Sequence, residues 1–321
     1  MDFEVLMKAS AEAAASATPV EATQLSIGYS WSEIPRWHEG VFYFSDMYNH
    51  RILTLDESGT ASTYIDASER SPLAPEAGST ATGTTEVVLG GLGWLPDGRA
   101  IVVSMHERLL LVSDGTTLEQ YADLRDVAIS SCNDMVVDAE GRAYITQLGY
   151  DLFAGEDPRE AGLIVVEPDG TVRDSGVGTF RGANGIGLSA DGGTLLTAEN
   201  DGCRISALDR AADGTLSGRR VWAELPWMPD GIAIDAEGGV WAGLPGSGWV
   251  GRFVEGGQAT HAVQLPMDRA MGTAVALGGS DRSTLFIACG MEVFDWAKSR
   301  DEGLGSIWTA SAPHSAGTTR P

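Results

Sequence analysis

Four residues with side-chain oxygens occupy the same position in a pattern that recurs along the chain. Asn133, Asn184 and Asp230 each stand eight residues before the glycine of an acid–glycine turn, and Glu33 stands seven residues before such a glycine. Two carboxylates and two amide carbonyls form a set of hard oxygen donors, which suits Ca²⁺ or Mn²⁺ better than a metal that prefers thiolate. An ion held in this way keeps positions for water or substrate, so it can polarise a carbonyl or activate a bound water.

Each of these residues taken alone has a simpler explanation. Asn and Asp favour turns that precede strands, because their side chains hydrogen-bond to the nearby backbone. Two observations weigh against this explanation for the set. The four residues share one register, and Glu33 is a poor turn former. We therefore interpret the four residues as converging on one oxygen-lined site.

The repeated unit is an apolar alternating strand, an acid–glycine turn and a second strand. It is clearest in "CNDMVVDAEGRAYIT", "ANGIGLSADGGTLLT" and "PDGIAIDAEGGVWAG". Gly90 and Met271 hold the equivalent position in two further copies, so six copies recur at spacings of 41–57 residues. One four-stranded propeller blade has this length, about 40–50 residues. The longest spacing contains the Gly/Ser/Thr/Pro-rich stretch 67–85, which we expect to be a surface loop.

The repeat predicts an all-β protein, a six-bladed β-propeller with a metal site in its central channel. The first strand of each blade lines the channel, so equivalent residues of the six copies converge on the axis. Residues 23–321 are predicted to form this single domain, after a lead-in of residues 1–22 that is either a short helix or disordered. We expect "TQLSIGYSW" to pair with the strand around "GSIWTA", because closing the ring removes its exposed edges.

Composition excludes several classes of function. The chain has 45 Asp and Glu against 21 Lys and Arg, a formal charge of −24, which repels phosphate backbones and anionic membranes. We therefore expect neither nucleic acid nor a membrane as a partner. The three cysteines form no C-x-x-C pair, and the first residues lack the apolar segment of a signal peptide. These features predict reduced thiols and a cytoplasmic protein, while the oligomeric state is not indicated.

The motifs "SEIPRW", "CNDMVVDAEGRAYIT", "ANGIGLSADG" and "PDGIAIDAEGGVWAG" resemble those of the SMP-30/gluconolactonase/luciferin-regenerating-enzyme family, from about Ser32 to Trp308. The resemblance implies a six-bladed propeller with a divalent metal, usually calcium, in the channel; Mn²⁺, Mg²⁺ and Zn²⁺ are the alternatives. It also implies lactonase activity, although relatives include organophosphate hydrolases. The "C-x-D-M-V-x-D" run and the following "GYD" resemble a staphylococcal drug-responsive lactonase in particular.

Carried over to this chain, the resemblance implies that Glu33, Asn184 and Asp230 bind the metal. Asn133 is then either a fourth ligand or a contact to the substrate, and Asp134 is an acid that orients ligands or assists water activation. Family members that act on sugar lactones tend to carry Arg where this chain has Ser131. The difference favours a lactone or ester that is less polar than a sugar lactone.

The chemistry expected of this site is hydrolysis of a lactone or related ester, with the cation polarising the carbonyl while a water attacks it. A carboxylate in the channel takes the proton of that water. Asp230 and Asp134 are both candidates for this role, and a carboxylate that already binds the metal is the weaker base. Direct attack by Asp230 as a nucleophile is a further alternative.

Several other residues are candidates for contact with the substrate. The long segment 147–162 is expected to cover the channel mouth with Tyr150 and Phe153, unless it is only a solvated loop with two anchoring aromatic residues. Gln147 stands where the family commonly has Asp or Asn. His106 lies at the end of a strand and either reaches the channel or is a structural histidine. Met271 is either an apolar wall of the site or core filling.

Two functions from different classes fit these features. The first is a calcium-dependent lactonase or esterase that acts on a small molecule. The second is a non-catalytic propeller that binds a small ligand or a protein partner and holds a structural metal. The sequence has no G-x-S-x-G motif and no H-E-x-x-H motif, so neither a serine hydrolase of that type nor a zinc protease is indicated.

Overall fold

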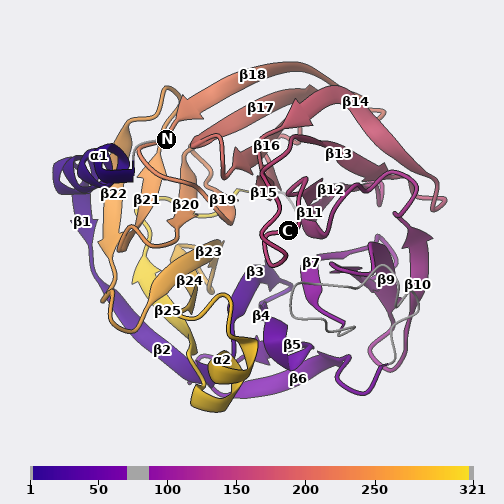
Figure 1. Ribbon diagram of the computed structural model, residues 1–321, viewed down its shortest axis with the longest axis horizontal. Helices are drawn as coiled ribbons and strands as arrows, with labels where there is room; N and C mark the ends of the chain where they lie inside the picture. The colour runs from indigo at the N-terminus through magenta and orange to yellow at the C-terminus, as the bar shows by residue number, and fades with distance from the viewer. Residues whose placement is uncertain (1–2, 71–86, 318–321) are drawn as a thin grey trace.

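The protein is a ring of six sheets, as a computed structural model that describes residues 3–70 and 87–317 shows (Figure 1). Each sheet runs outward from the central axis, and its innermost strand is the first strand of the repeated unit. The prediction of a six-bladed β-propeller is therefore confirmed. Of the stretch 67–85, only residues 67–70 are described, so the loop expected there lies mostly outside the described residues.

The first three blades follow one another along the chain, each with four strands in meander order. Blade 1 consists of β3 (Ser32–His38), β4 (Val41–Asp46), β5 (Arg51–Leu55) and β6 (Ala61–Asp66), with a 3₁₀ turn η1 (Met47–Asn49) between β4 and β5. Blade 2 consists of β7 (Leu89–Trp94), β8 (Ala100–Ser104), β9 (Leu109–Ser113) and β10 (Leu118–Asp123). Blade 3 consists of β11 (Cys132–Val137), β12 (Ala143–Gln147), β13 (Ala161–Val166) and β14 (Val172–Phe180).

The last three blades include the start of the chain. Blade 4 consists of β15 (Ala183–Leu188), β16 (Thr194–Glu199), β17 (Arg204–Arg210) and β18 (Leu216–Glu224). Blade 5 consists of β19 (Ile232–Ile234), β20 (Val240–Leu244), β21 (Trp249–Phe253), β22 (Ala259–Gln264) and, added at its outer edge, β1 (Thr18–Val20). Blade 6 consists of β23 (Met271–Gly278), β24 (Thr284–Gly290), β25 (Gly305–Ser311) and β2 (Ala22–Tyr29), with helix α2 (Trp296–Glu302) between β24 and β25.

The innermost strands form a closed inner ring. Each of β3, β7, β11, β15, β19 and β23 contacts the next, and β23 contacts β3. Little space separates them. A Cβ atom at Gly90 would lie 2.6 Å from the carbonyl oxygen of Asn133, and one at Gly185 would lie 2.5 Å from that of Asp230. Glycine is needed at both places because the backbones of neighbouring blades touch there.

The ring is closed by a strand from each end of the chain. β2 pairs antiparallel with β25 over Ala22–Tyr29, which confirms the pairing expected from the sequence. The residues before β2 also lie against the propeller. Helix α1 (Phe3–Ser16) packs near blade 5, where Trp249 donates a hydrogen bond of 2.8 Å to Ser10, and β1 pairs parallel with β22. No helix among the described residues is long and apolar enough to cross a membrane.

The core lies between neighbouring blades, because each sheet buries both faces against the next. One apolar cluster joins blades 1 and 2 through Ile52 and Leu92, and another joins blades 1 and 6 through Phe42 and Phe286. The aromatic pair Phe42 and Phe286 stacks at 4.3 Å between ring centroids. Aromatic and branched side chains of adjacent sheets thus hold the six blades in place.

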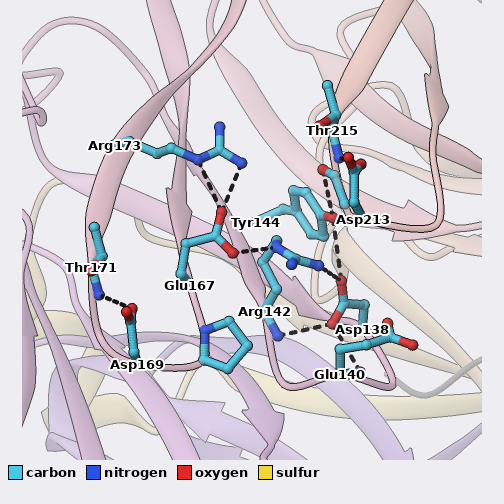
Figure 2. A network of polar contacts seen from close by, with 12 residues as sticks. Asp138, Glu140, Arg142, Tyr144, Glu167, Asp169, Thr171, Arg173, Asp213 and Thr215 are labelled. Atoms are coloured by element: carbon cyan, nitrogen blue, oxygen red, sulfur yellow. Dashed lines mark hydrogen bonds and ion pairs between the residues drawn. The ribbon is translucent and has the colours of Figure 1, made fainter.

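A network of charged side chains ties blade 3 to blade 4 (Figure 2). Arg142 lies between two carboxylates and donates to Asp138 at 2.8 Å and to Glu167 at 2.6 Å. Arg210 of blade 4 reaches across to the same turn of blade 3, where it donates to Asp138 at 2.6 Å and to the hydroxyl of Tyr144 at 3.0 Å. Asp138 therefore binds two guanidinium groups from two blades, which lowers its pKa even though burial opposes the shift.

We expect Arg210→Met to destabilise the protein by about 1–3 kcal/mol, because it removes the hydrogen bonds between blades from an almost buried charged group. Guanidinium unfolding followed by tryptophan fluorescence measures the loss. The control is Arg220→Met, which removes an exposed ion pair with Asp209 within blade 4 and should cost less than about 1 kcal/mol. Equal losses in the two variants would contradict a structural role for the link between blades.

Candidate metal and substrate site

The residues at the repeated position lie where the inner strands begin. Glu33, Gly90, Asn133, Asn184 and Met271 stand at the first or second residue of β3, β7, β11, β15 and β23. In each of these five strands the pairing register shifts at this position or within two residues of it. A β-bulge bends a strand and redirects the neighbouring side chain. The sixth position, Asp230, precedes β19 in an irregular segment.

Three carboxylates come close together at this end of the channel. Glu33 and Asp134 are buried, whereas Asp230 is half-buried. Burial raises the pKa of Glu33 to about 7, and the negative charge of Asp134 contributes. The pKa of Asp230 is also raised, first by burial and then by the charges of Glu33 and Asp134. Like charges gathered away from water are unfavourable unless a cation or protons balance them.

One of the three carboxylates has its own counter-charge. Arg36 from β3 forms a buried ion pair with Asp134, two residues into β11, and it also donates to the carbonyl oxygens of Leu92 and Met135 at 3.0 and 2.9 Å. Arg36 thus crosses the axis from blade 1 to blades 2 and 3. Burial still raises the pKa of Asp134, with Arg36 opposing the shift. Glu33 and Asp230 remain the carboxylates without a buried ion pair among the described contacts.

Amide groups complete the polar ring. The amide of Asn184 lies beside the side chain of Asp230 and lowers its pKa, and the backbone N–H of Gly185 donates to the carbonyl oxygen of Asp230 at 3.2 Å. Asn133 is buried and directly precedes Asp134. Among the described residues, no group of three or more His, Cys, Asp or Glu side chains is placed to hold a metal. A cation at this position would therefore depend on the amide oxygens as well as on Glu33 and Asp230.

His106 and Ser131, both expected at the substrate side, lie together. The Nδ1 atom of His106 is 2.9 Å from the hydroxyl of Ser131. Burial lowers the pKa of His106 to about 4, although Asp151 opposes the shift, so the imidazole is neutral at pH 7. Gln147 holds the segment that carries Ser131, because its side-chain oxygen accepts from the backbone N–H of Ile129 at 2.8 Å.

The segment 147–162 contributes two aromatic side chains with different roles. The hydroxyl of Tyr150 donates to Asp201 at 3.3 Å, so this side chain anchors the segment to blade 4. Phe153 is half-buried and lies edge-on to Trp296 at 5.1 Å between ring centroids. Met271 packs against the same apolar cluster as Phe153. The structure thus brings Phe153 and Met271 to one wall, whereas the hydroxyl of Tyr150 is engaged elsewhere.

Four aromatic residues that the sequence analysis did not single out lie near Phe153 and the candidate site. Trp31, Tyr48 and Trp296 are buried, and Phe294 is exposed. Trp31 stacks on Tyr48 at 5.9 Å, and Tyr48 stacks on Trp296 at 4.8 Å. Trp31 also lies beside Glu33 and lowers its pKa, so the aromatic residues adjoin the carboxylates. Their spacing follows no common register, so the sequence carried no signal that would group them.

Arg36 is a further functional residue that sequence reasoning missed. It stands within "SEIPRW", a motif that was noticed for Glu33. A positive charge in the middle of an innermost strand was the available signal, since a buried guanidinium requires a carboxylate partner.

Residues 31–290 match the family described as the SMP-30/Gluconolactonase/LRE-like region. The chain belongs to this family. The match covers most of the propeller, from the residue before β3 to the end of β24. The resemblance inferred from the four sequence motifs is therefore confirmed.

Named relatives agree with this membership. Regucalcin of Xenopus laevis is 31% identical over 181 residues, which are 54% of this chain and 60% of that protein. Pentonolactonase XacC of Haloferax volcanii is 26% identical over 220 residues, which are 66% of this chain and 71% of that protein. The aligned stretch therefore spans less than two thirds of the Xenopus protein.

Solved structures share the fold. The structure of a calcium-binding protein, regucalcin, from Agrobacterium tumefaciens has a TM-score of 0.71 and 18% sequence identity, and it covers 94% of this chain and 98% of its own. At this identity the likeness shows the common propeller architecture. The chemistry has to be argued from the residues of this chain.

The burial of His106 predicts a pH dependence of stability. The pKa of His106 is lower in the folded protein than in the unfolded chain, so below pH 6.5 the unfolded chain binds the proton more readily. The free energy of unfolding therefore decreases as the pH falls from 6.5 towards 4. We expect the drop in melting temperature between pH 7 and pH 5 to be smaller in His106→Gln than in the wild type. Differential scanning calorimetry measures both.

The matched control is Ser131→Ala, which removes the hydroxyl partner and keeps the imidazole. It should retain the wild-type drop between pH 7 and pH 5. An unchanged drop in His106→Gln would show that His106 is not buried as a neutral group.

Proposed function

We propose that the protein is a lactonase that hydrolyses a lactone or a related ester with the help of a divalent cation, most readily Ca²⁺. The observation that carries the proposal is that Glu33, which is buried, and Asp230, which is half-buried, have no positive partner among the described contacts and lie beside the amides of Asn133 and Asn184. Two relatives support it by their names, one as a pentonolactonase and one as a calcium-binding protein. The proposal places the reaction at the start of the inner strands.

The donor set of this chain fits such a cation. Glu33, Asn133, Asn184 and Asp230 supply oxygen donors only, and the raised pKa values of the two carboxylates mean that they lack a positive partner. Ca²⁺ prefers six to eight oxygen ligands, of which carboxylates, amide carbonyls and water are the usual kinds. When bound, the cation would supply the positive charge that stabilises the developing oxyanion of the lactone carbonyl.

The proton transfers of the reaction are assigned to side chains of this protein. In hydrolysis, the oxygen of water bonds to the acyl carbon, the bond from that carbon to the ring oxygen breaks, and the water's protons end on the leaving oxygen and on a base. Asp230 is the carboxylate placed to take a proton, because its contacts are to Asn184 and to like charges and not to a guanidinium. Without a cation, burial and like charges raise the pKa of Asp230, and a bound cation would lower it again, so its strength as a base depends on how directly it contacts the cation.

Asp134 has a different role in this proposal. Its Oδ1 atom accepts from Arg36 and from the backbone N–H of Met135 at 2.7 Å, so its charge is already compensated. A carboxylate held by a guanidinium is a poor proton acceptor. In this proposal Asp134 positions the start of β11, including Asn133, and Arg36 opposes the rise in the pKa of Asp134 that burial causes. The proposal therefore assigns the proton acceptor to Asp230 and not to Asp134.

The cation dependence is tested by titrating metal-free protein with CaCl₂ in a calorimeter and by assaying γ-butyrolactone with and without chelator. Mutation of a residue that only supports a metal ligand weakens metal binding about 10- to 100-fold. We expect Glu33→Gln and Asp230→Asn to weaken Ca²⁺ binding by more than this, because both residues are proposed as ligands. Turnover should be lost with the chelator and restored by Ca²⁺. The control is Glu237→Gln, an exposed acid in the turn after β19, which should bind and react as the wild type.

Two results would contradict the proposal. Hydrolysis that persists in metal-free Asp230→Asn would remove both the cation and the base from the mechanism. Tight Ca²⁺ binding without turnover of any lactone, aryl ester or phosphotriester would instead favour a binding propeller with a structural metal.

The role of Asp134 is tested by Asp134→Asn, which keeps the shape of the side chain and removes its charge. We expect kcat to fall about 10- to 100-fold through misplacement of Asn133, while the rate still falls at low pH, with the apparent pKa lowered because the charge of Asp134 no longer raises the pKa of Asp230. Asp230→Asn should abolish that pH dependence together with turnover. A profile that no longer falls at low pH in Asp134→Asn would make Asp134 the proton acceptor and disprove our assignment.

A further inference from the structure

An aromatic roof covers the carboxylates on the axis. We define it as Trp31, Tyr48, His106, Phe153 and Trp296, which come from connections of blades 1, 2, 3 and 6. Its members are in mutual contact. Trp296 stacks on Tyr48 at 4.8 Å, lies 5.9 Å from the ring of His106 and meets the edge of Phe153 at 5.1 Å between centroids. The roof lies next to the site, because the side chain of Trp31 lies beside Glu33.

The polar atoms of the roof are satisfied, with one exception. The hydroxyl of Tyr48 donates to the carbonyl oxygen of Val293 at 2.9 Å, and His106 contacts the hydroxyl of Ser131 at 2.9 Å. The indole N–H of Trp296 is buried and has no hydrogen-bond acceptor among the residues that the structure describes. A buried N–H without an acceptor is unfavourable, so this group calls for a partner from outside the chain.

The chemistry of the roof's side chains determines which kind of ligand can bind there. Flat aromatic faces and edges favour another aromatic ring, with centroids about 4.5–7 Å apart. They offer few partners for the several hydroxyl groups of a sugar lactone, and each hydroxyl buried without a partner is costly. Phe153 is half-buried and contacts Phe294, which is 62% exposed, so the edge of the roof at Phe153 lies near the protein surface.

We propose that the aromatic roof binds the aromatic substituent of a lactone, and that the indole N–H of Trp296 donates a hydrogen bond to an oxygen of that substrate. Trp296 is thus a specificity-determining residue of the lactonase site. This inference rests on the proposed function for the identity of the reacting group. The preference for an aromatic substituent rests on the roof alone.

The first test uses a binding probe that no hydrolase can open. 3-Phenylcyclopentanone carries a phenyl ring and one carbonyl oxygen, and cyclopentanone is its partner without the ring. We expect 3-phenylcyclopentanone to shift one indole N–H signal, among those of the nine tryptophans, in a ¹H–¹⁵N spectrum of the Ca²⁺-supplemented protein. That signal should be missing in Trp296→Phe. Cyclopentanone at equal concentration should shift it much less.

The second test compares the hydrolysis of γ-phenyl-γ-butyrolactone, γ-butyrolactone and D-glucono-δ-lactone. We expect the wild type to prefer the phenyl-substituted lactone over γ-butyrolactone by at least about tenfold in kcat/KM, and to act on the sugar lactone least. Trp296→Phe keeps an aromatic ring and removes the N–H, so its KM for the phenyl lactone should rise about five- to tenfold with kcat little changed. Phe153→Ala should reduce the preference for phenyl.

Trp241→Phe is the matched control. Trp241 is also buried with an unpartnered indole N–H, but it lies on β20 in the apolar core of blade 5. It should change neither KM nor substrate preference, so any general effect of removing a buried N–H is accounted for.

The outcomes separate this inference from the proposed function. If no lactone is hydrolysed but 3-phenylcyclopentanone still shifts the signal of Trp296, the roof is supported and the lactonase proposal fails. Two results would overturn the inference while the lactonase proposal stands. One is an equal kcat/KM for γ-butyrolactone, the sugar lactone and the phenyl lactone. The other is hydrolysis of lactones without any response of the Trp296 signal to 3-phenylcyclopentanone.

Discussion

Closing six sheets into a ring forces the starts of six strands onto one axis, and most features of the site follow from this crowding. The inner strands lie so close that glycine is required at Gly90 and Gly185. Bulges at five of the six strand starts redirect the side chains there. The same geometry brings Glu33 and Asp230, which are far apart in the sequence, into one region of shared negative charge. The strand pairing of β2 with β25 holds this arrangement closed.

The charge on the axis is only partly balanced within the chain. Arg36 compensates Asp134 and, through the carbonyl oxygens of two further blades, also fixes the spacing of the inner strands. No comparable ion pair among the described contacts balances Glu33 or Asp230. The protein therefore keeps two carboxylates in an environment where their charged forms are unfavourable, an arrangement that is common where a cation binds or a proton is transferred.

Much of this architecture was readable because the chain repeats itself. A strand followed by a glycine turn, seen six times at the spacing of a blade, predicted the propeller and its closure. The shared register also placed Glu33, Asn133, Asn184 and Asp230 at equivalent points, since equivalent points of a propeller meet at the axis. The roles of these side chains remain a prediction. The sequence left open whether the lead-in is helical or disordered, and the extra strand β1 was not foreseen, because contacts of these segments such as those with blade 5 carry no local signal.

The sequence by itself determined which residues are equivalent, because strand periodicity and turn chemistry are local properties that repeat with the blade. Only the tertiary structure decided which unlike residues meet. Arg36 and Asp134 are 98 residues apart and occupy different positions of the repeat, yet they form one ion pair. Tyr48 and Val293 are 245 residues apart and join the roof. Such contacts depend on how neighbouring blades and the connections above them pack, and packing between distant segments follows from three-dimensional shape and charge that no single stretch of sequence encodes.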